Sequence, residues 1–333
     1  MFLCDKCNKE FKTELLKTKH LERKPPCKKP YPKPILKWVG GKSQLLDKLL
    51  KNFPKLFDNY HEIFIGGGSV LFGFLQLIKE GSITMSGKVY AYDLNEPLIS
   101  VYKNIQSNPS KLYESLQSLI SDYTSCINGN GNLNRKPKTI EEAKQLKENY
   151  YYWVRTQYNK MTISEKKSLA GSAAFIFLNK TCFRGVFRIG PNGYNVPYGH
   201  YDNPEIINEA HLYEIHELIK DVIFECCDFE TPLTNNIQEN DFVYLDPPYA
   251  PETETSFVGY TENGFGIEKH EQLFKLCNKL NNLNKKFMMS NSDVKLVRDN
   301  FTEDKYSIES ILCKRAINSK EPGSKAKEVI IIN

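Results

Sequence analysis

The residues best suited to chemistry stand together as Asp246, Pro247 and Tyr249, at the end of a short apolar run. The Asp246 carboxylate and the Pro247 carbonyl can each accept a hydrogen bond, and the Tyr249 ring offers a flat face. The X-Pro steps restrict the backbone, so these groups are held in place before a ligand arrives. The pattern predicts activation of the exocyclic amine of a nucleobase, and a strand followed by a plain proline turn is the alternative.

A second group of reactive side chains, Cys4, Cys7, His20 and Cys27, crowds the start of the chain. Two residues separate the first pair, twelve more precede His20, and six precede Cys27. In a reducing compartment such a cluster indicates a metal rather than disulfides. Three thiolates and one imidazole make a closed zinc site on a hairpin and a helix, a small ββα zinc finger that would depend on zinc for its stability. An amphipathic helix with chance cysteines is the alternative.

A glycine-rich turn indicates the fold that must position Asp246. Residues 61–72 have the pattern of strand, turn and helix, with Phe64, Gly66 and Gly68 at the turn. Glycines there let the backbone approach a ligand closely, as in dinucleotide-binding folds. Their spacing departs from Gly-x-Gly-x-x-Gly, which argues against a nicotinamide cofactor.

Two further strands are predicted to end in an acid. Residues 89–92 lead to Asp93, which is well placed to bind ribose hydroxyls or to cap the next helix. The apolar run before Asp246 has the composition of a buried strand. Together with the glycine turn, these strands predict a doubly wound α/β core that binds a cofactor.

The remaining segments surround this core. We predict a proline-rich linker over 28–34, a helix over 43–50, mostly polar helices over 97–170 with a loop at 128–138, a helix over 269–280, and strands over 287–290 and 328–333. In residues 178–199, aromatic and arginine side chains alternate ahead of a Pro-Asn-Gly turn. This pattern favours a hairpin that contacts DNA, with a plain surface hairpin as the alternative.

The net charge of +5 is unevenly distributed over the 333 residues. Residues 1–30 hold nine lysines and arginines against four acids, so the rest of the chain is formally neutral. Such a basic appendage is typical of a protein that meets phosphate. No apolar run suits a membrane span and no signal segment opens the chain. We therefore expect an intracellular protein, in the cytoplasm or, in a eukaryotic or viral setting, in the nucleus or a viral factory.

Six sequence blocks, in the same order, resemble the DNA adenine methyltransferase family that includes Dam. They are Lys-Trp-x-Gly-Gly-Lys at 37–42, the glycine turn, the acid at Asp93, the block 178–199, Asp-Pro-Pro-Tyr at 246–249 and the closing blocks after 287. The resemblance covers residues 34 to 333. It implies a Rossmann-like S-adenosylmethionine-dependent methyltransferase core over 34–96 and 216–333, a mostly helical target-recognition insertion over 97–215, and the zinc finger over 1–29 as a C2HC variant.

The resemblance also implies roles for individual residues. The cofactor S-adenosylmethionine would meet Trp38, Lys42, Phe64, Gly66, Gly68, Asp93, Asp228, Phe229 and Asp246, although Asp228 could equally cap a helix. Double-stranded DNA would meet Phe183, Arg184, Arg188, Asn195 and Pro197, with Arg188 reading a guanine edge and Phe183 wedged beside the displaced base. Catalysis would use Asp246, Pro247 and Tyr249, with the loop 250–266 closing over the extruded adenine.

Ile63 stands where the family usually has proline, which is a minor departure. The resemblance implies a GATC target, and Arg184 and His200, which stand where the family often has asparagine and arginine, leave other targets open. We expect a monomer or weak dimer, and a partner nuclease stays open. The alternatives are a zinc-finger DNA-binding protein with an inactive methyltransferase domain, or a methyltransferase that acts on RNA adenine or protein glutamine.

Overall fold

The computed structural model describes residues 1–4, 6–7, 9–24, 27, 29–126, 131–251, 264–314 and 325–333. The chain forms two compact units, Met1–Lys33 and Pro34–Asn333. Most of the loop predicted to close over an extruded base (252–263) and most of the closing block at 314–319 lie outside the described residues.

The Met1–Lys33 unit consists of two short strands and one helix. Strand β1 (Phe2–Leu3) pairs antiparallel with β2 (Glu10–Phe11), and helix α1 (Glu14–Leu21) follows. The side chain of Thr13 accepts a hydrogen bond from the Leu16 amide, which caps the first turn of the helix. The order strand, strand, helix is the one that the cysteine and histidine spacing predicts.

The Pro34–Asn333 unit is built on a seven-stranded sheet. Its strands, in their order across the sheet, are β12 (Ser307–Lys314), β13 (Lys325–Ile332), β11 (Lys286–Ser292), β10 (Phe242–Leu245), β4 (Tyr60–Glu62), β6 (Val89–Asp93) and β9 (Val222–Cys226). The five strands from β11 to β9 are parallel, and β13 runs antiparallel between β11 and β12. The sheet is therefore mostly parallel, as the sequence predicts for the core.

The strand order reverses between β4 and β10. From β4 the chain adds β6 and then β9 on one side, and it returns to add β10 and β11 on the other. In an open α/β sheet, such a reversal leaves a crevice at the carboxyl ends of the two strands, where ligands bind. The glycine turn follows β4 and Asp246 follows β10, so both predicted motifs meet at this crevice.

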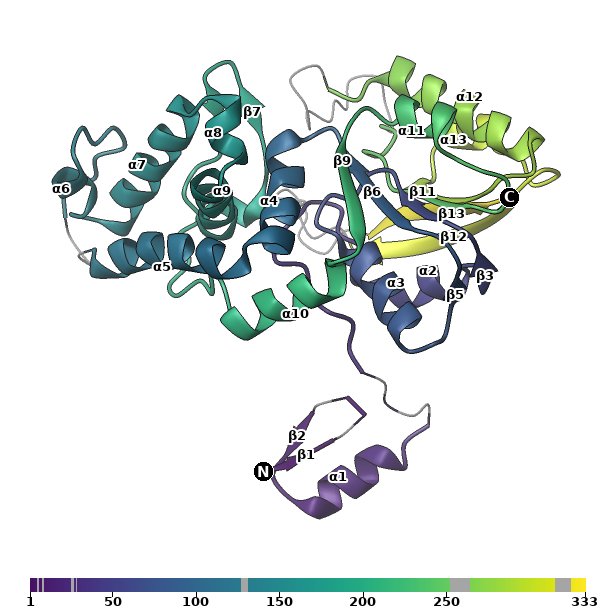
Figure 1. Ribbon diagram of the computed structural model, residues 1–333, viewed down its shortest axis with the longest axis horizontal. Coiled ribbons are helices and arrows are strands. Elements are labelled where there is room, and N and C mark those ends of the chain that lie inside the picture. The colour runs from purple at the N-terminus through teal and green to yellow at the C-terminus, as the bar shows by residue number, and fades with distance from the viewer. Residues whose placement is uncertain are drawn as a thin grey trace. The chain divides into compact units, whose positions relative to one another are not determined.

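Helices cover both faces of the sheet. Figure 1 shows α11 (Glu230–Asn235), α12 (Ile267–Asn282) and α13 (Lys295–Asn300) on one face, and α2 (Leu46–Lys51), α3 (Ser69–Lys79) and α10 (Glu209–Ile219) on the other. All four residues of β10 are buried. Its Val243 and Leu245 join the core beneath α12, whereas its Phe242 contacts the ring of Phe53 on the opposite face. A wholly apolar strand is the expected composition for the centre of a covered parallel sheet.

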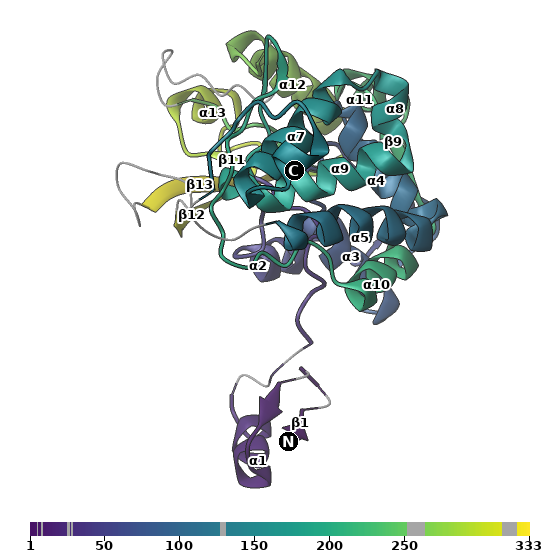
Figure 2. The same ribbon diagram turned by 90° about the vertical axis from the view of Figure 1, so that its left-hand side faces the viewer.

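Between β6 and β9 the described chain is largely helical. It contains α4 (Glu96–Ser107), α5 (Pro109–Ser125), α6 (Ile140–Ala143), α7 (Lys147–Lys160), α8 (Ile163–Lys167) and α9 (Leu169–Thr181), then the 3₁₀ turn Phe183–Gly185 and the hairpin of β7 (Ile189–Gly190) and β8 (Gly193–Tyr194). Figure 2 shows this region from the side on which α5, α7 and α9 lie in front of the sheet. The helices predicted over 97–170 and the hairpin at Pro-Asn-Gly are confirmed.

Several boundaries differ from the sequence predictions. The helix expected over 43–50 begins only at Leu46, because Lys42 and the residues after it form turns. Helix α10 and strand β12 were not anticipated, and neither was the short parallel pair of β3 (Leu56–Phe57) and β5 (Thr84–Met85). Among the described residues, none of the helices combines the length and apolar character that a membrane span requires.

Candidate active site

A cavity of about 1330 Å³ lies at the crevice between β4 and β10. It is large enough for a nucleoside-sized ligand together with a second ring, because typical small-molecule pockets enclose roughly 300–1,000 Å³. Ten of the residues predicted to bind cofactor or to act in catalysis line it: Trp38, Lys42, Phe64, Gly66, Asp93, Asp228, Phe229, Asp246, Pro247 and Tyr249. The structure thus brings the glycine turn and the Asp246 corner to one space.

The Asp246 carboxylate forms an ion pair inside this cavity. Its Oδ1 atom lies 2.7 Å from Nζ of Lys42, and the same ammonium lies 4.8 Å from the centre of the Tyr249 ring. Burial raises the pKa of Asp246 to about 6; the Lys42 ammonium opposes this shift and the Glu328 carboxylate adds to it. The Asp246 carboxylate therefore changes its protonation state close to neutral pH.

The glycine turn is shaped by contact with Trp38. Gly66 has φ of +47°, and a Cβ atom there would lie 2.7 Å from Cδ1 of Trp38. Its carbonyl accepts a 2.7 Å hydrogen bond from the Tyr102 hydroxyl, which fixes the turn. Gly68, with φ of +76°, is the N-cap of α3, and a Cβ atom there would meet Phe72 and Tyr102 rather than the cavity. A side chain at Gly66 would collide with the Trp38 indole beside the cavity, so this position of the turn requires glycine.

Asp93 stands at the end of β6 with both oxygens directed to backbone donors. Oδ2 accepts from the Gly66 amide at 3.1 Å, and Oδ1 accepts from the Asn95 amide at 2.9 Å. Burial raises its pKa to about 6 even though these hydrogen bonds lower it. The cap of α4 is the side chain of Asn95, which accepts from Leu98, so the capping alternative for Asp93 is wrong. Each Asp93 oxygen keeps acceptor capacity for a ligand hydroxyl.

Asp228 and Phe229 line the cavity after β9. The Asp228 carboxylate accepts from the Glu230 amide at the start of α11 and lies 3.3 Å from Nζ of Lys269. The same lysine lies over the Phe229 ring at 5.2 Å. Asp228 therefore supports a helix start and borders the cavity at the same time, so the two predicted roles are compatible.

The residues predicted to contact DNA lie outside the cavity lining. Among the described residues, Phe183, Arg184, Arg188, Asn195 and Pro197 are all exposed. Nε of Arg188 donates to Oδ1 of Asn195 at 2.6 Å, which orients the guanidinium across the hairpin. Arg184 has φ of +56° and its guanidinium lies over the Phe183 ring at 5.2 Å.

The cavity residues that the sequence analysis missed include Glu62, Phe187, Lys269 and Glu328. Phe187 stacks on Trp38 at 5.8 Å, and Glu328 accepts a 2.8 Å hydrogen bond from the Tyr249 hydroxyl. Glu62 is buried at the end of β4, and burial raises its pKa to about 8. A carboxylate inside or beside an apolar strand, as at Glu62 and Glu328, is the signal that could have found two of them.

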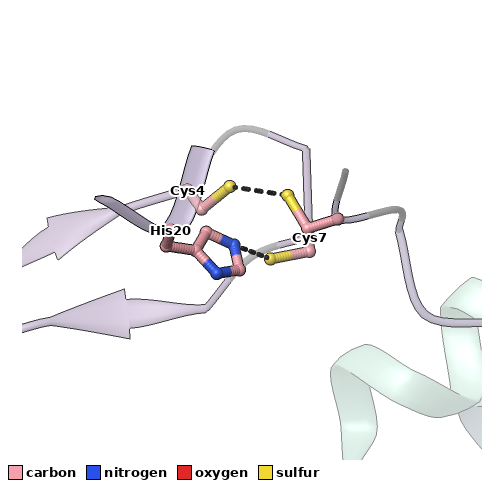
Figure 3. A group of neighbouring side chains, drawn as sticks. Cys4, Cys7 and His20 are labelled. Atoms are coloured by element: carbon pink, nitrogen blue, oxygen red, sulfur yellow. Dashed lines mark hydrogen bonds between the residues drawn. The ribbon is translucent and has the colours of Figure 1, made fainter. Parts of the chain in front are cut away.

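In the Met1–Lys33 unit, Cys4, Cys7, His20 and Cys27 converge. Figure 3 shows the first three side chains directed toward one another, and the ligand atoms of all four lie within 4.8 Å of each other. Sγ of Cys4 lies 3.6 Å from Sγ of Cys27, and Sγ of Cys7 lies 3.1 Å from Nε2 of His20. A disulfide would need a sulfur separation of about 2.0 Å, so the thiols are free.

A mostly parallel sheet, a cavity at its reversal point and an Asp-Pro-Pro-Tyr corner facing a glycine turn are the arrangement expected of a methyltransferase that uses S-adenosylmethionine. The sequence model of the D12 class N6 adenine-specific DNA methyltransferases matches residues 38–317. The chain belongs to this family, and it is a DNA adenine methyltransferase.

Curated relatives align over most of their length. A type II methyltransferase of Methanocaldococcus jannaschii is 36% identical over 313 residues, which cover 90% of this chain and 99% of the relative. A type II methyltransferase of Lactococcus lactis is 29% identical, and the alignment covers 90% of this chain and 95% of the relative. A DNA adenine methylase of Escherichia coli is 26% identical, and the alignment covers 86% of this chain and 89% of the relative.

Proposed function

We propose that the cavity binds S-adenosylmethionine at its glycine-turn end and receives an adenine, turned out of the DNA duplex, at its Asp246 end. One observation carries the proposal: a single cavity is lined by Gly66 and Asp93 and also by Asp246 and Tyr249. A base inside a duplex cannot reach a buried carboxylate, so the target nucleotide must leave the stack.

The chemistry of the donor set fits this cofactor. The free lone pairs of the Asp93 carboxylate suit ribose hydroxyls, and the Phe229 and Phe64 rings suit a purine face. Bound there, S-adenosylmethionine supplies a methyl group on a positively charged sulfur. The chain's own contribution is to hold the cofactor and the base so that the amine faces that methyl group; such positioning supplies much of the rate acceleration.

At the other end, the ionised Asp246 carboxylate and the Pro247 carbonyl accept hydrogen bonds from the adenine amine, and Tyr249 stacks on the ring. The ammonium of Lys42 occupies the same acceptor at 2.7 Å and the same ring face at 4.8 Å. Stacking of the adenine on that ring face therefore displaces Lys42 from Tyr249, and the amine can bind either Asp246 oxygen. After transfer, the methylated amine is acidic and loses its proton readily, so Asp246 needs no strong basicity.

The exposed hairpin is proposed to read the DNA. Arg188, oriented by Asn195, suits bidentate contact with a guanine edge, and the exposed Phe183 ring suits a wedge beside the displaced base. The sequence resemblance to the family that includes Dam makes GATC the proposed target. Arg184 and His200 are the positions at which a different sequence preference would arise.

The Met1–Lys33 unit is proposed to hold structural zinc. Two thiolates that bind one tetrahedral zinc ion at about 2.3 Å lie roughly 3.8 Å apart, and the Cys4–Cys27 separation of 3.6 Å is close to this value. Three sulfurs and one imidazole complete a closed site without a water position. The positive charge of the unit supports a sequence-independent contact with phosphates.

The test is methylation of DNA prepared from cells that lack adenine methylation, followed by sequencing that maps N6-methyladenine. The intact chain should methylate one short sequence. Asp246→Ala should lower the single-turnover rate by roughly 10²–10³-fold, as expected for loss of a preorganised contact. The matched control is Asp299→Ala, which removes an exposed carboxylate paired with Lys295 on α13. Equal rates for both variants would refute the proposed role of Asp246.

A further inference from the structure

The residues that follow the two prolines have no regular secondary structure. Tyr249 and Ala250 lie beyond the end of β10 and belong to neither a helix nor a strand. Proline restricts its own φ and the residue before it, so Pro247 and Pro248 leave the backbone of Tyr249 unrestrained, and Pro251 restricts only Ala250. A stacking platform nevertheless needs a defined ring orientation, so other contacts must fix these two residues.

Three side chains from the neighbouring strands make those contacts. Oδ1 of Asn291 accepts from the Ala250 amide at 3.0 Å, and Oγ of Ser292 donates to the Ala250 carbonyl at 2.6 Å. The Tyr249 hydroxyl donates to Oε2 of Glu328 at 2.8 Å. Both polar groups of the Ala250 backbone and the far end of the Tyr249 ring are therefore held from the sheet.

The sheet register explains why these side chains reach one place. Ser292, the last residue of β11, is paired directly with Glu328 on the antiparallel strand β13. Side chains of directly opposed residues lie on the same face. One cross-strand pair thus contacts two consecutive residues of the loop, Ala250 through Ser292 and Tyr249 through Glu328.

The orientation of the Asn291 amide is dictated by its neighbours. Its Oδ1 atom also accepts from the Ser292 amide at 2.8 Å, so two backbone donors face the oxygen. The flipped amide would place Nδ2 against both donors, which the hydrogen-bonding inventory of asparagine forbids. Asn291 is fully buried, and its Nδ2 atom has no hydrogen-bond partner within the described part of the chain. The Asn291 side chain thus leaves its Nδ2 donor unpaired while its Oδ1 atom holds Ala250. Buried polar groups rarely stay unpaired, so this arrangement needs an explanation.

We propose that Asn291, Ser292 and Glu328 form a clamp that sets the angle of the Tyr249 ring and are positioning residues for methyl transfer. The inference rests on the proposed stacking of the target adenine on Tyr249. Glu328 acts through the Tyr249 hydroxyl, while Asn291 and Ser292 act through the peptide that follows it. Without the clamp the ring rotates, and the adenine amine no longer faces the methyl donor.

A double-mutant cycle tests the contact with Glu328. Tyr249→Phe removes the hydroxyl but keeps the ring, and Glu328→Ala removes the acceptor. Single-turnover transfer should fall about tenfold in each variant and no further in the double variant, because both remove one interaction. Glu328→Gln should restore the rate to within about threefold, since its amide oxygen accepts the same hydrogen bond. The dissociation constant for S-adenosylmethionine should stay unchanged, which separates positioning from unfolding.

A spectroscopic measurement reports the ring orientation directly. DNA with 2-aminopurine at the mapped target position should be brighter in complex with Glu328→Ala or Ser292→Ala than with the unaltered chain, because poorer stacking on Tyr249 quenches less. Glu309→Gln is the matched control: Glu309 lies on the adjacent strand β12 and pairs with Lys48 at the surface. It should change neither rate nor fluorescence.

The outcomes separate the clamp from the function on which it rests. Full activity in Tyr249→Ala would overturn the stacking role and the clamp together. An inactive Tyr249→Ala combined with unchanged rates in Glu328→Ala and Ser292→Ala would overturn the clamp alone, as would additive losses in the double-mutant cycle.

Discussion

The Met1–Lys33 and Pro34–Asn333 units gather their functional side chains in different ways. Cys4, Cys7, His20 and Cys27 come from 24 consecutive residues and converge around a hairpin and one helix. Lys42, Asp246 and Glu328 are far apart in the sequence. Asp246 and Glu328 reach the same cavity because β10 and β13 both flank β11 in the sheet, and Lys42 reaches Asp246 from the turn before α2. The first site depends on local spacing, and the second depends on topology.

The two units also differ in what stabilises them. In the smaller unit, Phe2, Leu3, Leu15, Leu16 and Leu21 are exposed, with Leu15 at 64%. In the larger unit, buried apolar side chains pack against both faces of the sheet. With so many of its described apolar side chains exposed, the smaller unit would rely on the proposed zinc for its stability, whereas a sheet with two covered faces does not need a metal.

Removal of zinc gives the largest expected difference between the units. A chelator, or Cys7→Ser, should unfold the smaller unit, because structural zinc contributes roughly 10–16 kcal/mol in such peptides. Metal analysis should fall from one zinc per chain to none, and amide exchange over residues 1–33 should become fast. Exchange in β10 and β11 should stay slow. Protection of residues 1–33 in the metal-free protein would contradict the comparison.

The substitution Asp241→Ala should destabilise the larger unit and leave the smaller unit unaffected. The Asp241 carboxylate is buried and accepts hydrogen bonds from Asn59, from the Gln238 amide and from Nε2 of His61. Asp241→Ala leaves these donors unpaired, so the free energy of unfolding of the larger unit should fall by about 3–5 kcal/mol. Denaturant titration measures it, and the zinc content should not change. Its pKa is lowered to about 2 despite burial, chiefly by the hydrogen bond from His61, so this stabilisation is present above about pH 4 and is lost as pH falls toward 2.

A smaller effect is expected at the glycine turn. Gly66→Ala introduces a Cβ that meets the Trp38 indole at a residue with positive φ, at a cost of about 1–3 kcal/mol. Displacement of Trp38 should weaken S-adenosylmethionine binding, measured by calorimetry. Gly81→Ala is the control, because Gly81 has φ of +70° and open space around it. If both variants bind the cofactor normally, Trp38 is not part of its site.

The smallest expected effect is a pH dependence confined to the larger site. Because the pKa of Asp246 is raised to about 6, the carboxylate is ionised above that pH and becomes protonated as pH falls through it. The value of kcat/KM should therefore decline by about tenfold per pH unit below 6. Glu328→Gln removes a charge that raises this pKa, so the decline should move to lower pH. A flat profile between pH 5 and 7 would show that Asp246 does not titrate during catalysis.

The sequence allowed most of the core to be predicted, because strand ends carry local signals. The strands before Asp93 and Asp246 and the glycine turn at Gly66 are confirmed in position, and the proximity of Trp38 to the turn follows from the resemblance. The roles assigned to these residues, and the domain boundaries within the larger unit, stay predictions.

What escaped prediction depends on long-range pairing. Glu328 reaches Tyr249 only because β13 inserts antiparallel beside β11, and no local pattern specifies that insertion. Phe187 stacks on Trp38, whereas its neighbour Arg188 is exposed. Both residues lie in a short irregular segment, where no regular pattern predicts which side chain is exposed. Helix α2 begins late because residues 43–45 form a turn, and Lys42 before this turn pairs with Asp246, which follows a strand far along the chain.

The position of β13 has a consequence for biosynthesis. This strand, the last of the sheet, lies between β11 and β12 and carries the carboxylate that holds Tyr249. A ribosome-bound chain can pair β4, β6, β9, β10 and β11 beforehand, yet the stacking ring stays loose until residues 325–332 have emerged from the exit tunnel.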